Sequence, residues 1–405
     1  MTPPISIQEI AQARERIAPY IRKTPLLPFD YLSREKKKKI LLKCENLQVT
    51  GSFKIRGASN CVLENLAQAK ESGVIAASAG NHAQGVAAIS HLLGIPATIV
   101  MPTVTPPIKV QNTKRWGATA VLKGAVYNES FEYAQQLAQE KGYLFIHPFR
   151  DEKIMAGQGT IGMELEEDSQ FADTQALIIP VGGGGLLTGI VSYVKTKFPK
   201  IKIYGVTAKN APATWKSVKT GKVVEEAVRF TLAEGVATKT TDPTMMANIK
   251  NGTNDIFSIG EESIAHAISA LAEHGKLVVE GAGALGVAAI LDGLVPEERV
   301  TVVLSGGNID LPALSNVVQR GLVTQGRIQR LVITITDRPG GLNAVTQVLA
   351  DTGANILQVY HQRATLHAEI GEAEIEVDIE TRGKDHTAEI LTGLANKGFK
   401  VECVS

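Results

Sequence analysis

The spacing of apolar positions divides the chain into two parts with different predicted folds. Up to about residue 320, short apolar runs alternate with stretches whose apolar residues recur at helical spacing. The runs that we expect to form strands are ILLKCENL, VIAA, ATIVM, ATAVLKG, ALIIPV, IKIYGVTA and VTVVLS. Short apolar strands separated by helices are typical of parallel sheet. The sequence therefore predicts an open, doubly wound α/β arrangement.

Capping residues and helix breakers mark helix boundaries in this first part. Ser6 and Glu9 have the spacing of a capping box, which opens an amphipathic helix that Pro19 ends. Ser52 is the expected N-cap of a helix predicted from Phe53 to about Lys70.

The pattern changes near residue 325. From residue 330 it predicts strand, helix, two strands, helix and strand, in the segments RLVITIT, GGL to TG, ANILQVYHQRA, AEIEVDIETRG, 386–397 and FKVECV. This order is that of a ferredoxin-like βαββαβ unit. The segment GLVTQGRIQ before it is the predicted linker, so we place the boundary between residues 325 and 326.

Composition narrows the class of protein. The 405 residues are enough for two or three domains, and 44% hydrophobic residues, 20% charged residues and a net charge of +1 are typical of a soluble globular protein. Neither nucleic acid nor membrane is an expected partner at this charge, and the basic run at 34–39 is interpreted as a solvated loop. No signal peptide or apolar run of ~18 residues is present, so we expect a cytoplasmic protein. Three scattered cysteines predict neither a disulfide framework nor a zinc site, and no metal is expected.

Four glycines, Gly182 to Gly185, lie between a predicted strand and a predicted helix. Such a loop exposes backbone N–H groups at the positive end of a helix and suits a phosphate, although a tight turn is the simpler alternative. A dinucleotide is disfavoured because the next strand ends in Thr207 rather than an acidic residue, and no nucleoside-triphosphate motif is present. A small cofactor with one phosphate fits better.

The loop Ser78-Ala79-Gly80-Asn81-His82 also follows a strand and opens a helix. Its N–H groups and the side chains of Ser78 and Asn81 could hold a carboxylate, whereas simple helix capping is the structural alternative. His82 taken alone is more typical of a packed helix histidine than of a catalyst.

Lys54 lies at a predicted helix N-terminus beside Phe53. The helix dipole and burial both disfavour an ammonium there, and a lysine with a lowered pKa is a nucleophile able to form a Schiff base. Ser305 follows the strand VTVVL, where its hydroxyl could meet a ring nitrogen as a neutral partner. Either residue alone would be weak support for a function.

Taken together, GSFKIRGA, SAGNHAQG, GGGGL and SGGN occur in one order, and over most of residues 1–320 the chain resembles the threonine and serine dehydratases of the pyridoxal-phosphate fold type II family. The resemblance implies two open, twisted parallel-sheet domains: a large one of about 1–45 and 146–325, and a small one of about 46–145. It also implies pyridoxal 5'-phosphate as the cofactor and an amino-acid substrate.

The resemblance implies a role for each matching residue. Lys54 would hold the cofactor in a Schiff base and act as the catalytic base, with Phe53 beside the ring. The residues that would hold the phosphate are Gly182, Gly183, Gly184, Gly185 and Leu186. Asn81 would bond the ring hydroxyl and Ser305 the pyridine nitrogen. The residues that would line the substrate carboxylate pocket are Ser78, Ala79, Gly80 and His82.

Two departures from the family pattern refine the expected reaction. Racemising relatives carry a second serine where this chain has Ala79, which favours elimination. Relatives that bind a divalent cation carry acidic residues where Thr207 and Ala213 stand, which puts that metal site in doubt. The expected reaction is the deamination of L-threonine to 2-oxobutanoate and ammonia, with activity on L-serine. The alternatives are an L-serine dehydratase or serine racemase, and a non-catalytic amino-acid sensor.

The C-terminal unit, residues 326–405, resembles an ACT regulatory domain, whose strand-to-helix ligand loop matches DRPGGL at 337–342. The resemblance implies pairing across a subunit interface, an amino-acid effector and, by analogy, a homodimer or homotetramer. A structural appendage that only mediates assembly is the alternative. Isoleucine synthesis and threonine breakdown are both open as the metabolic role.

Overall fold

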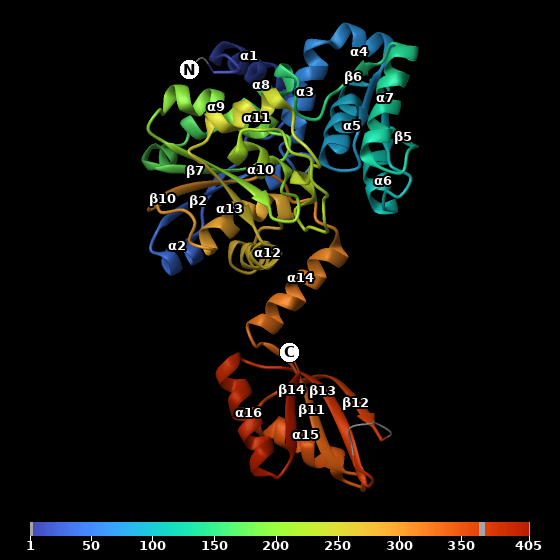
Figure 1. Ribbon diagram of the computed structural model, residues 1–405, viewed down its shortest axis with the longest axis vertical. Helices are drawn as coiled ribbons and strands as arrows, with labels where there is room; N and C mark the ends of the chain where they lie inside the picture. Colours follow the sequence, from blue (N-terminus) through green and yellow to red (C-terminus); the bar gives the residue numbers. More distant parts are fainter. Residues whose placement is uncertain (1–2, 364–368, 405) are drawn as a thin grey trace. The chain divides into compact units, whose positions relative to one another are not determined.

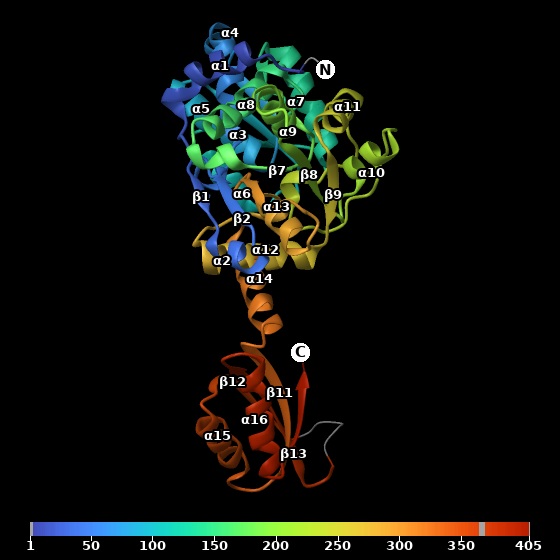
Figure 2. The same ribbon diagram turned by 90° about the vertical axis from the view of Figure 1, so that its left-hand side faces the viewer.

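The computed structural model describes residues 3–363 and 369–404 (Figures 1 and 2). Contacts along the chain divide it into two compact units, residues 1–309 and 310–405. The first unit contains two sheets and the second contains one.

The larger sheet of the first unit has six strands in the order β1-β2-β10-β7-β8-β9. Their bounds are β1 Leu26–Pro28, β2 Lys39–Cys44, β7 Ala176–Pro180, β8 Lys202–Ala208, β9 Asp255–Ile259 and β10 Arg299–Leu304. All neighbours are parallel except β1, which pairs antiparallel with β2. The predicted parallel α/β arrangement is confirmed.

The smaller sheet has four parallel strands in the order β5-β4-β3-β6. Their bounds are β3 Val74–Ala77, β4 Ala97–Met101, β5 Thr119–Leu122 and β6 Leu144–Phe145. This sheet lies within the predicted small domain, although the predicted domain limits themselves stay a prediction. In Figure 1 it lies between α5 and α7, beside the larger sheet's layers.

Helices cover the sheets of the first unit. Their bounds are α1 Ile7–Ile17, α2 Asp30–Lys36, α3 Lys54–Glu64, α4 Leu66–Ser72, α5 Asn81–Leu93, α6 Pro107–Lys114, α7 Tyr127–Lys141, α8 Glu152–Glu166, α9 Gly185–Lys197, α10 Ala213–Thr220, α11 Pro243–Gly252, α12 Glu261–Gly275 and α13 Gly281–Leu291. The capping box of Ser6 and Glu9 is present at α1, as predicted.

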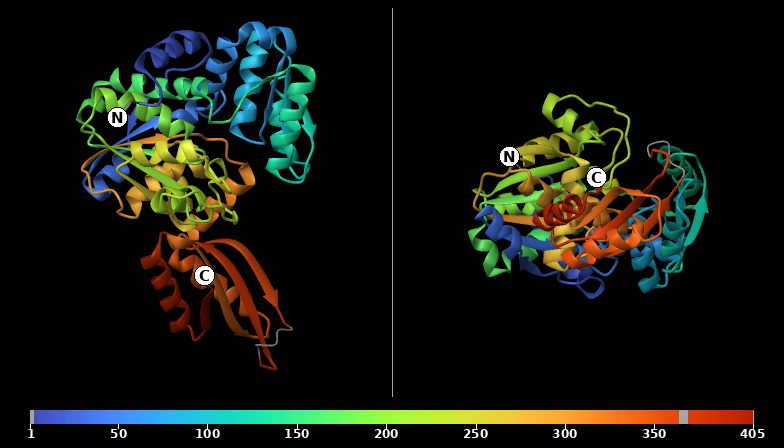
Figure 3. Two further views of the ribbon diagram at one scale, coloured as in Figure 1. Left: turned by 45° about the horizontal axis from the view of Figure 1, so that its top comes forward. Right: turned by 90° about the horizontal axis from the view of Figure 1, so that it is seen from below.

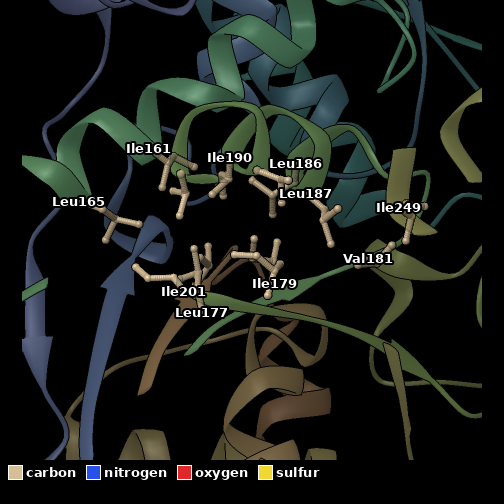
Figure 4. Packing of buried hydrophobic residues seen from close by; sticks show 14 of the residues in the cluster. Ile161, Leu165, Leu177, Ile179, Val181, Leu186, Leu187, Ile190, Ile201 and Ile249 are labelled. Atoms are coloured by element: carbon tan, nitrogen blue, oxygen red, sulfur yellow. The ribbon is translucent and has the colours of Figure 1, made fainter. Parts of the chain in front are cut away.

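The main core of the first unit packs two helices onto the larger sheet. Figure 4 shows Ile161 and Leu165 of α8 and Leu186, Leu187 and Ile190 of α9 directed at side chains of the sheet. Facing them are Leu177 and Ile179 of β7 and the following Val181. Burying one such side chain contributes about 1.5–3 kcal/mol. Because several side chains of α9 are buried against β7, this packing holds the start of α9 near the end of β7.

The segment after β2 differs from its prediction. Ser52 does not cap α3: it forms an isolated antiparallel bridge with Gly306, and Phe53 takes the N-cap position without a side-chain cap. The single helix predicted to about Lys70 is interrupted at Asn65 and continues as α4. Pairing with a strand end far along the chain outweighs the local preference of serine for a helix cap.

The second unit has an antiparallel sheet in the order β12-β13-β11-β14, with helices α15 and α16 packed on one face (Figure 3). Its elements are α14 Leu311–Thr324, β11 Ile328–Thr336, α15 Gly341–Thr352, β12 Asn355–Gln362, β13 Glu372–Glu380, α16 Lys384–Asn396 and β14 Lys400–Val404. The ferredoxin-like order is confirmed. The predicted linker is wrong in part, because residues 321–324 end α14 and residues 328–329 begin β11.

Within the described residues, the helices are too short or too polar to cross a membrane.

Candidate active site

The three loops singled out in the sequence all follow the carboxyl ends of parallel strands. The Ser78 loop joins β3 to α5, the glycine loop joins β7 to α9, and the Ser305 loop follows β10. In open α/β sheets, ligands bind beyond these strand ends. The first loop belongs to the smaller sheet and the other two to the larger sheet, so a site here is built from both.

The segment that carries Lys54 is attached to the Ser305 loop by its backbone. The Phe53 N–H donates to the Ser305 carbonyl at 3.1 Å, and the Gly307 N–H donates to the Gly51 carbonyl at 2.8 Å. Gly51 has a φ of +70°, and a Cβ there would lie 2.5 Å from Oδ1 of Asn308. Only glycine fits this approach, which places Lys54 beside the end of β10.

The Lys54 amine is held in a polar but poorly solvated position. Its Nζ donates to the Pro148 carbonyl at 2.7 Å and lies 5.3 Å from the centroid of the Phe53 ring. Burial lowers the pKa of the Lys54 amine to about 8, while the charge of Glu280 opposes this shift. The predicted lowering is therefore present, with burial as its main cause, and more of the amine is unprotonated near neutral pH than in an ordinary lysine.

The glycine loop leaves donors free at the start of α9. Among the backbone hydrogen bonds of residues 3–363, none has the N–H of Gly183, Gly184, Gly185 or Leu186 as its donor, and the first bond of the helix runs from Thr188 to the Gly184 carbonyl. Such unpaired N–H groups at a helix N-terminus bind anions. The loop therefore fits a phosphate group.

Close packing explains why these positions are glycines. A Cβ on Gly183 would lie 2.5 Å from carbons of the Phe149 ring, and one on Gly185 would lie 2.6 Å from the Phe149 carbonyl. A Cβ on Gly182 would lie 2.9 Å from Cα of Val236. Phe149 directly follows Pro148, the acceptor of the Lys54 amine, so one short segment contacts both the glycine loop and the lysine.

The residues of the Ser78 loop differ in their contacts and in their burial. The Ser78 hydroxyl accepts from the Gly80 N–H at 3.2 Å, and Gly80 rather than Ser78 or Asn81 is the N-cap of α5. His82 is buried, and its Nε2 lies 2.9 Å from the Ile146 carbonyl, which only accepts. Burial and the nearby Lys54 charge lower the pKa of His82 to about 3, so its imidazole is neutral at physiological pH. Ala79 packs against the core of the smaller sheet.

Three residues of the site escaped the sequence reasoning: Glu280, Asn308 and Pro148. Asn81 donates to Oε1 of Glu280 at 2.7 Å and accepts from Nδ2 of Asn308 at 2.7 Å, and Pro148 accepts from Lys54. Asn308 belongs to the SGGN motif, whose pattern predicts a role for Ser305 alone. The available signal for Glu280 was one carboxylate between an apolar run and the apolar helix GAGALGVAAI.

Thr207 and Ala213, at the positions where the family resemblance implies acidic metal ligands in some relatives, have side chains without a carboxylate. The Thr207 hydroxyl donates to the Phe257 carbonyl at 3.1 Å, and Ala213 begins α10. Across residues 3–363 and 369–404, histidine, cysteine and acidic side chains form no group of three that could hold a metal ion.

Comparison with known proteins identifies the class to which this fold and site belong. A family model described as pyridoxal-phosphate dependent enzyme matches residues 17–306, and one described as ACT domain matches residues 330–397. The chain belongs to the family of pyridoxal-phosphate-dependent enzymes and carries a C-terminal ACT domain.

Particular relatives narrow the class. An L-threonine ammonia-lyase of Thermotoga maritima is 40% identical over 401 residues, which are 99% of this chain and 100% of the relative. The crystal structure of a T.th. threonine deaminase has a TM-score of 0.71 at 38% identity, covering 76% of this chain and 99% of that one. A maize serine racemase structure has a TM-score of 0.73 at 32% identity, covering 80% and 99%.

The glycine loop gives a first testable expectation. In Gly183→Ala the new methyl group overlaps the Phe149 ring, and relief of such overpacking costs about 1–3 kcal/mol and displaces the loop. We expect the affinity for pyridoxal phosphate, measured by fluorescence titration of the apoenzyme, to fall about tenfold or more. Gly260→Ala is the matched control, since a Cβ there meets nothing within 4 Å. Equal affinities in the two variants would remove the loop from the cofactor site.

Proposed function

We propose that this protein is an L-threonine ammonia-lyase that converts L-threonine to 2-oxobutanoate and ammonia, and that it also acts on L-serine. One observation carries the proposal: the amine of Lys54, whose pKa is lowered, donates to Pro148, and the adjoining Phe149 packs against the loop that carries four unpaired N–H groups. The first group suits a Schiff base and the second a phosphate. The names of the Thermotoga maritima relative and of the T.th. structure support threonine as the substrate.

In this proposal the chain's residues bind the cofactor and move one proton. The amides of residues 183–186 hold the phosphate, and Lys54 provides the amine that anchors the aldehyde. Bound there, pyridoxal phosphate would supply an electron sink for the pair left at Cα of the substrate. Lys54, released from its anchoring role, accepts the Cα proton at Nζ as the general base.

Ser305 and the Ser78 loop orient the reacting groups. The hydroxyl of Ser305, at the buried end of β10, is a neutral partner for the ring nitrogen and does not favour its protonation. Loss of the β-hydroxyl then competes better with reprotonation at Cα. The substrate loses water, and hydrolysis of the resulting enamine gives the 2-oxo acid and ammonia. Ser78, Ala79, Gly80 and His82 surround the substrate carboxylate, with His82 as a neutral wall.

Ala79 favours elimination over racemisation. Racemisation requires a second group that delivers a proton to the face of Cα opposite Lys54, and a methyl side chain has no proton to give. The structural likeness to maize serine racemase concerns the fold.

A steady-state assay on purified protein tests the proposed reaction. We expect L-threonine to yield 2-oxobutanoate and ammonia in equal amounts, L-serine to yield pyruvate with a lower kcat/KM, and no D-serine to form. Formation of D-serine would favour the racemase. Tight binding of either amino acid without turnover would favour an amino-acid sensor and contradict the proposal.

The second unit supports regulation by a small molecule. The segment 337–342 runs from the end of β11 into the first turn of α15, and Gly340, with a φ of +92°, is the N-cap of that helix. We propose that an amino acid binds at this loop, that paired copies form a homodimer or homotetramer, and that the enzyme works in the cytoplasm. Adding candidate amino acids to the same assay tests the effector.

A further inference from the structure

Four segments of the active site are joined by one chain of side-chain hydrogen bonds. Nδ2 of Asn308 donates to the Thr50 carbonyl at 2.8 Å and to Oδ1 of Asn81 at 2.7 Å. Nδ2 of Asn81 then donates to Oε1 of Glu280 at 2.7 Å. Thr50 precedes Lys54 by four residues, Asn308 follows β10, Asn81 begins α5, and Glu280 is the N-cap of α13.

The Thr50 carbonyl fixes the direction of every bond in this chain. A carbonyl oxygen only accepts, so Asn308 must turn its NH₂ group toward Thr50. The same NH₂ group contacts Asn81, which must therefore present its oxygen there and its own NH₂ group to Glu280. An NH₂ group has two hydrogens, and Glu280 takes one of them. The other is left for a ligand in the site.

We propose that Glu280 is a positioning residue for the bound pyridoxal group: by accepting one hydrogen of the Asn81 amide, it directs the second hydrogen at the oxygen of the cofactor ring. This inference rests on the proposed function and deepens it, because Asn81 then contacts the cofactor and Glu280 orients the Asn81 amide.

Glu280 is seated firmly enough for this task. Its N–H donates to the Gly306 carbonyl at 3.0 Å, which attaches the start of α13 to the loop after β10. A Cβ on Gly306 would lie 2.5 Å from Oε1 of Glu280, so the carboxyl group rests directly on this glycine. Residues 280 and 306 thus hold each other in place on the larger sheet, while Asn81 comes from the smaller one.

Glu280 can accept the hydrogen bond from Asn81 both as a carboxylate and as a carboxylic acid. Burial raises the pKa of Glu280 to about 7; the hydrogen bond from Asn81 lowers it, Glu234 raises it, and Lys109 and Lys54 lower it. Near neutral pH the group is a mixture of carboxylate and carboxylic acid. Oε1 accepts from Asn81 in both forms, so the amide orientation persists.

A double-mutant cycle with two readouts tests the inference. The variants are Glu280→Ala, Asn81→Ala and the double variant, and the readouts are the Kd for pyridoxal phosphate and the visible absorbance spectrum of the bound cofactor. We expect each single variant to weaken binding about tenfold and to shift the spectrum alike, and the double variant to be no worse than Asn81→Ala. Multiplying effects, about 100-fold in the double variant, would overturn the inference.

Glu280→Gln separates positioning from a requirement for negative charge. The amide keeps the volume and an accepting oxygen at the Oε1 position, so we expect a spectrum and Kd close to wild type. A Gln variant that binds the cofactor about tenfold more weakly than wild type would contradict the inference. Because this comparison is with wild type, it stays decisive if thermal unfolding shows that Glu280→Ala does not fold.

Two controls complete the experiment. Glu152→Ala removes an exposed carboxylate from the first turn of α8 and should change neither readout. Borohydride reduction followed by peptide mass mapping shows whether the cofactor is attached at Lys54 in the wild type. Absence of that modification would refute the proposed function, whereas its presence with multiplying effects in the cycle would refute only the role of Glu280.

Discussion

Lys54→Ala is expected to abolish turnover of L-threonine, with kcat/KM falling by at least about 1000-fold. The variant lacks both the amine that anchors the cofactor and the base that accepts the Cα proton. The variant also loses the hydrogen bond from the Lys54 amine to the Pro148 carbonyl. The helix α3 should persist, because alanine has the highest helix propensity. Coupled detection of 2-oxobutanoate measures the loss.

A surface lysine provides the comparison for this experiment. Lys70, exposed in the last turn of α4, carries the same charge, and Lys70→Ala should retain wild-type turnover. Borohydride labelling should mark the peptide containing residue 54 in wild type and Lys70→Ala, and should mark no peptide in Lys54→Ala. Retention of more than about a tenth of the wild-type kcat/KM in Lys54→Ala would require another base.

Arg56→Leu is expected to destabilise the first unit by about 3–5 kcal/mol. The Arg56 guanidinium bonds Glu45 through Nε and Nη2, both at 2.8 Å, and Glu164 through Nη1 and Nη2 at 2.8 and 2.9 Å. All three side chains are fully buried, and Lys43 is a further buried cation on Glu164 at 2.6 Å. Loss of Arg56 removes the cation that pairs with Glu45, whereas Glu164 keeps its ion pairs with Lys43 and Arg14.

Urea unfolding followed by circular dichroism measures this cost. Lys23→Ala is the control, since Lys23 pairs with Glu167 at the surface, and such pairs contribute at most about 1 kcal/mol. A change below about 1 kcal/mol in Arg56→Leu would show that the pocket rearranges to solvate the carboxylates.

Acid should narrow the stability gap between wild type and Arg56→Leu. Burial tends to raise the pKa of Glu164, but Arg56 and Lys43 outweigh it and hold that pKa at about 2. A carboxyl group whose folded pKa lies below its unfolded value of about 4.3 stabilises the fold above that value. The contribution is lost as the pH falls through about 2. If the difference in free energy of unfolding between wild type and Arg56→Leu stayed constant between about pH 4.3 and pH 2, the low pKa of Glu164 could not be due to Arg56.

The local sequence predicted those parts of the site that depend on the backbone conformation of one short segment. A glycine run after an apolar strand, and a lysine near a helix start, follow from local conformational needs that any fold must meet at those residues. The glycine run follows an apolar strand, and parallel strands separated by helices bring their carboxyl ends to one edge. The position of Lys54 beside Ser305 was implied only by resemblance, since no local pattern pairs residues 53 and 305.

The residues that were missed act through tertiary contacts. Glu280 is one of 41 acidic residues, and the contacts that distinguish it, with Asn81 and Gly306, form only in the folded chain. Pro148 contributes a backbone carbonyl, which every residue has. The error at Ser52 has the same origin: its preference for a cap is worth about 1 kcal/mol, and the bridge to Gly306 competes with it successfully.

The bridge between Ser52 and Gly306 also determines when the site can form during synthesis. The lysine leaves the ribosome early, but β2 obtains its parallel neighbour β10, and Phe53 its acceptor at Ser305, only after most of the first unit has been made. A nascent chain that ends before β10 lacks the strand that positions the lysine in the site for the vitamin-derived cofactor. Loading with the vitamin is therefore expected only after most of the first unit has been synthesised.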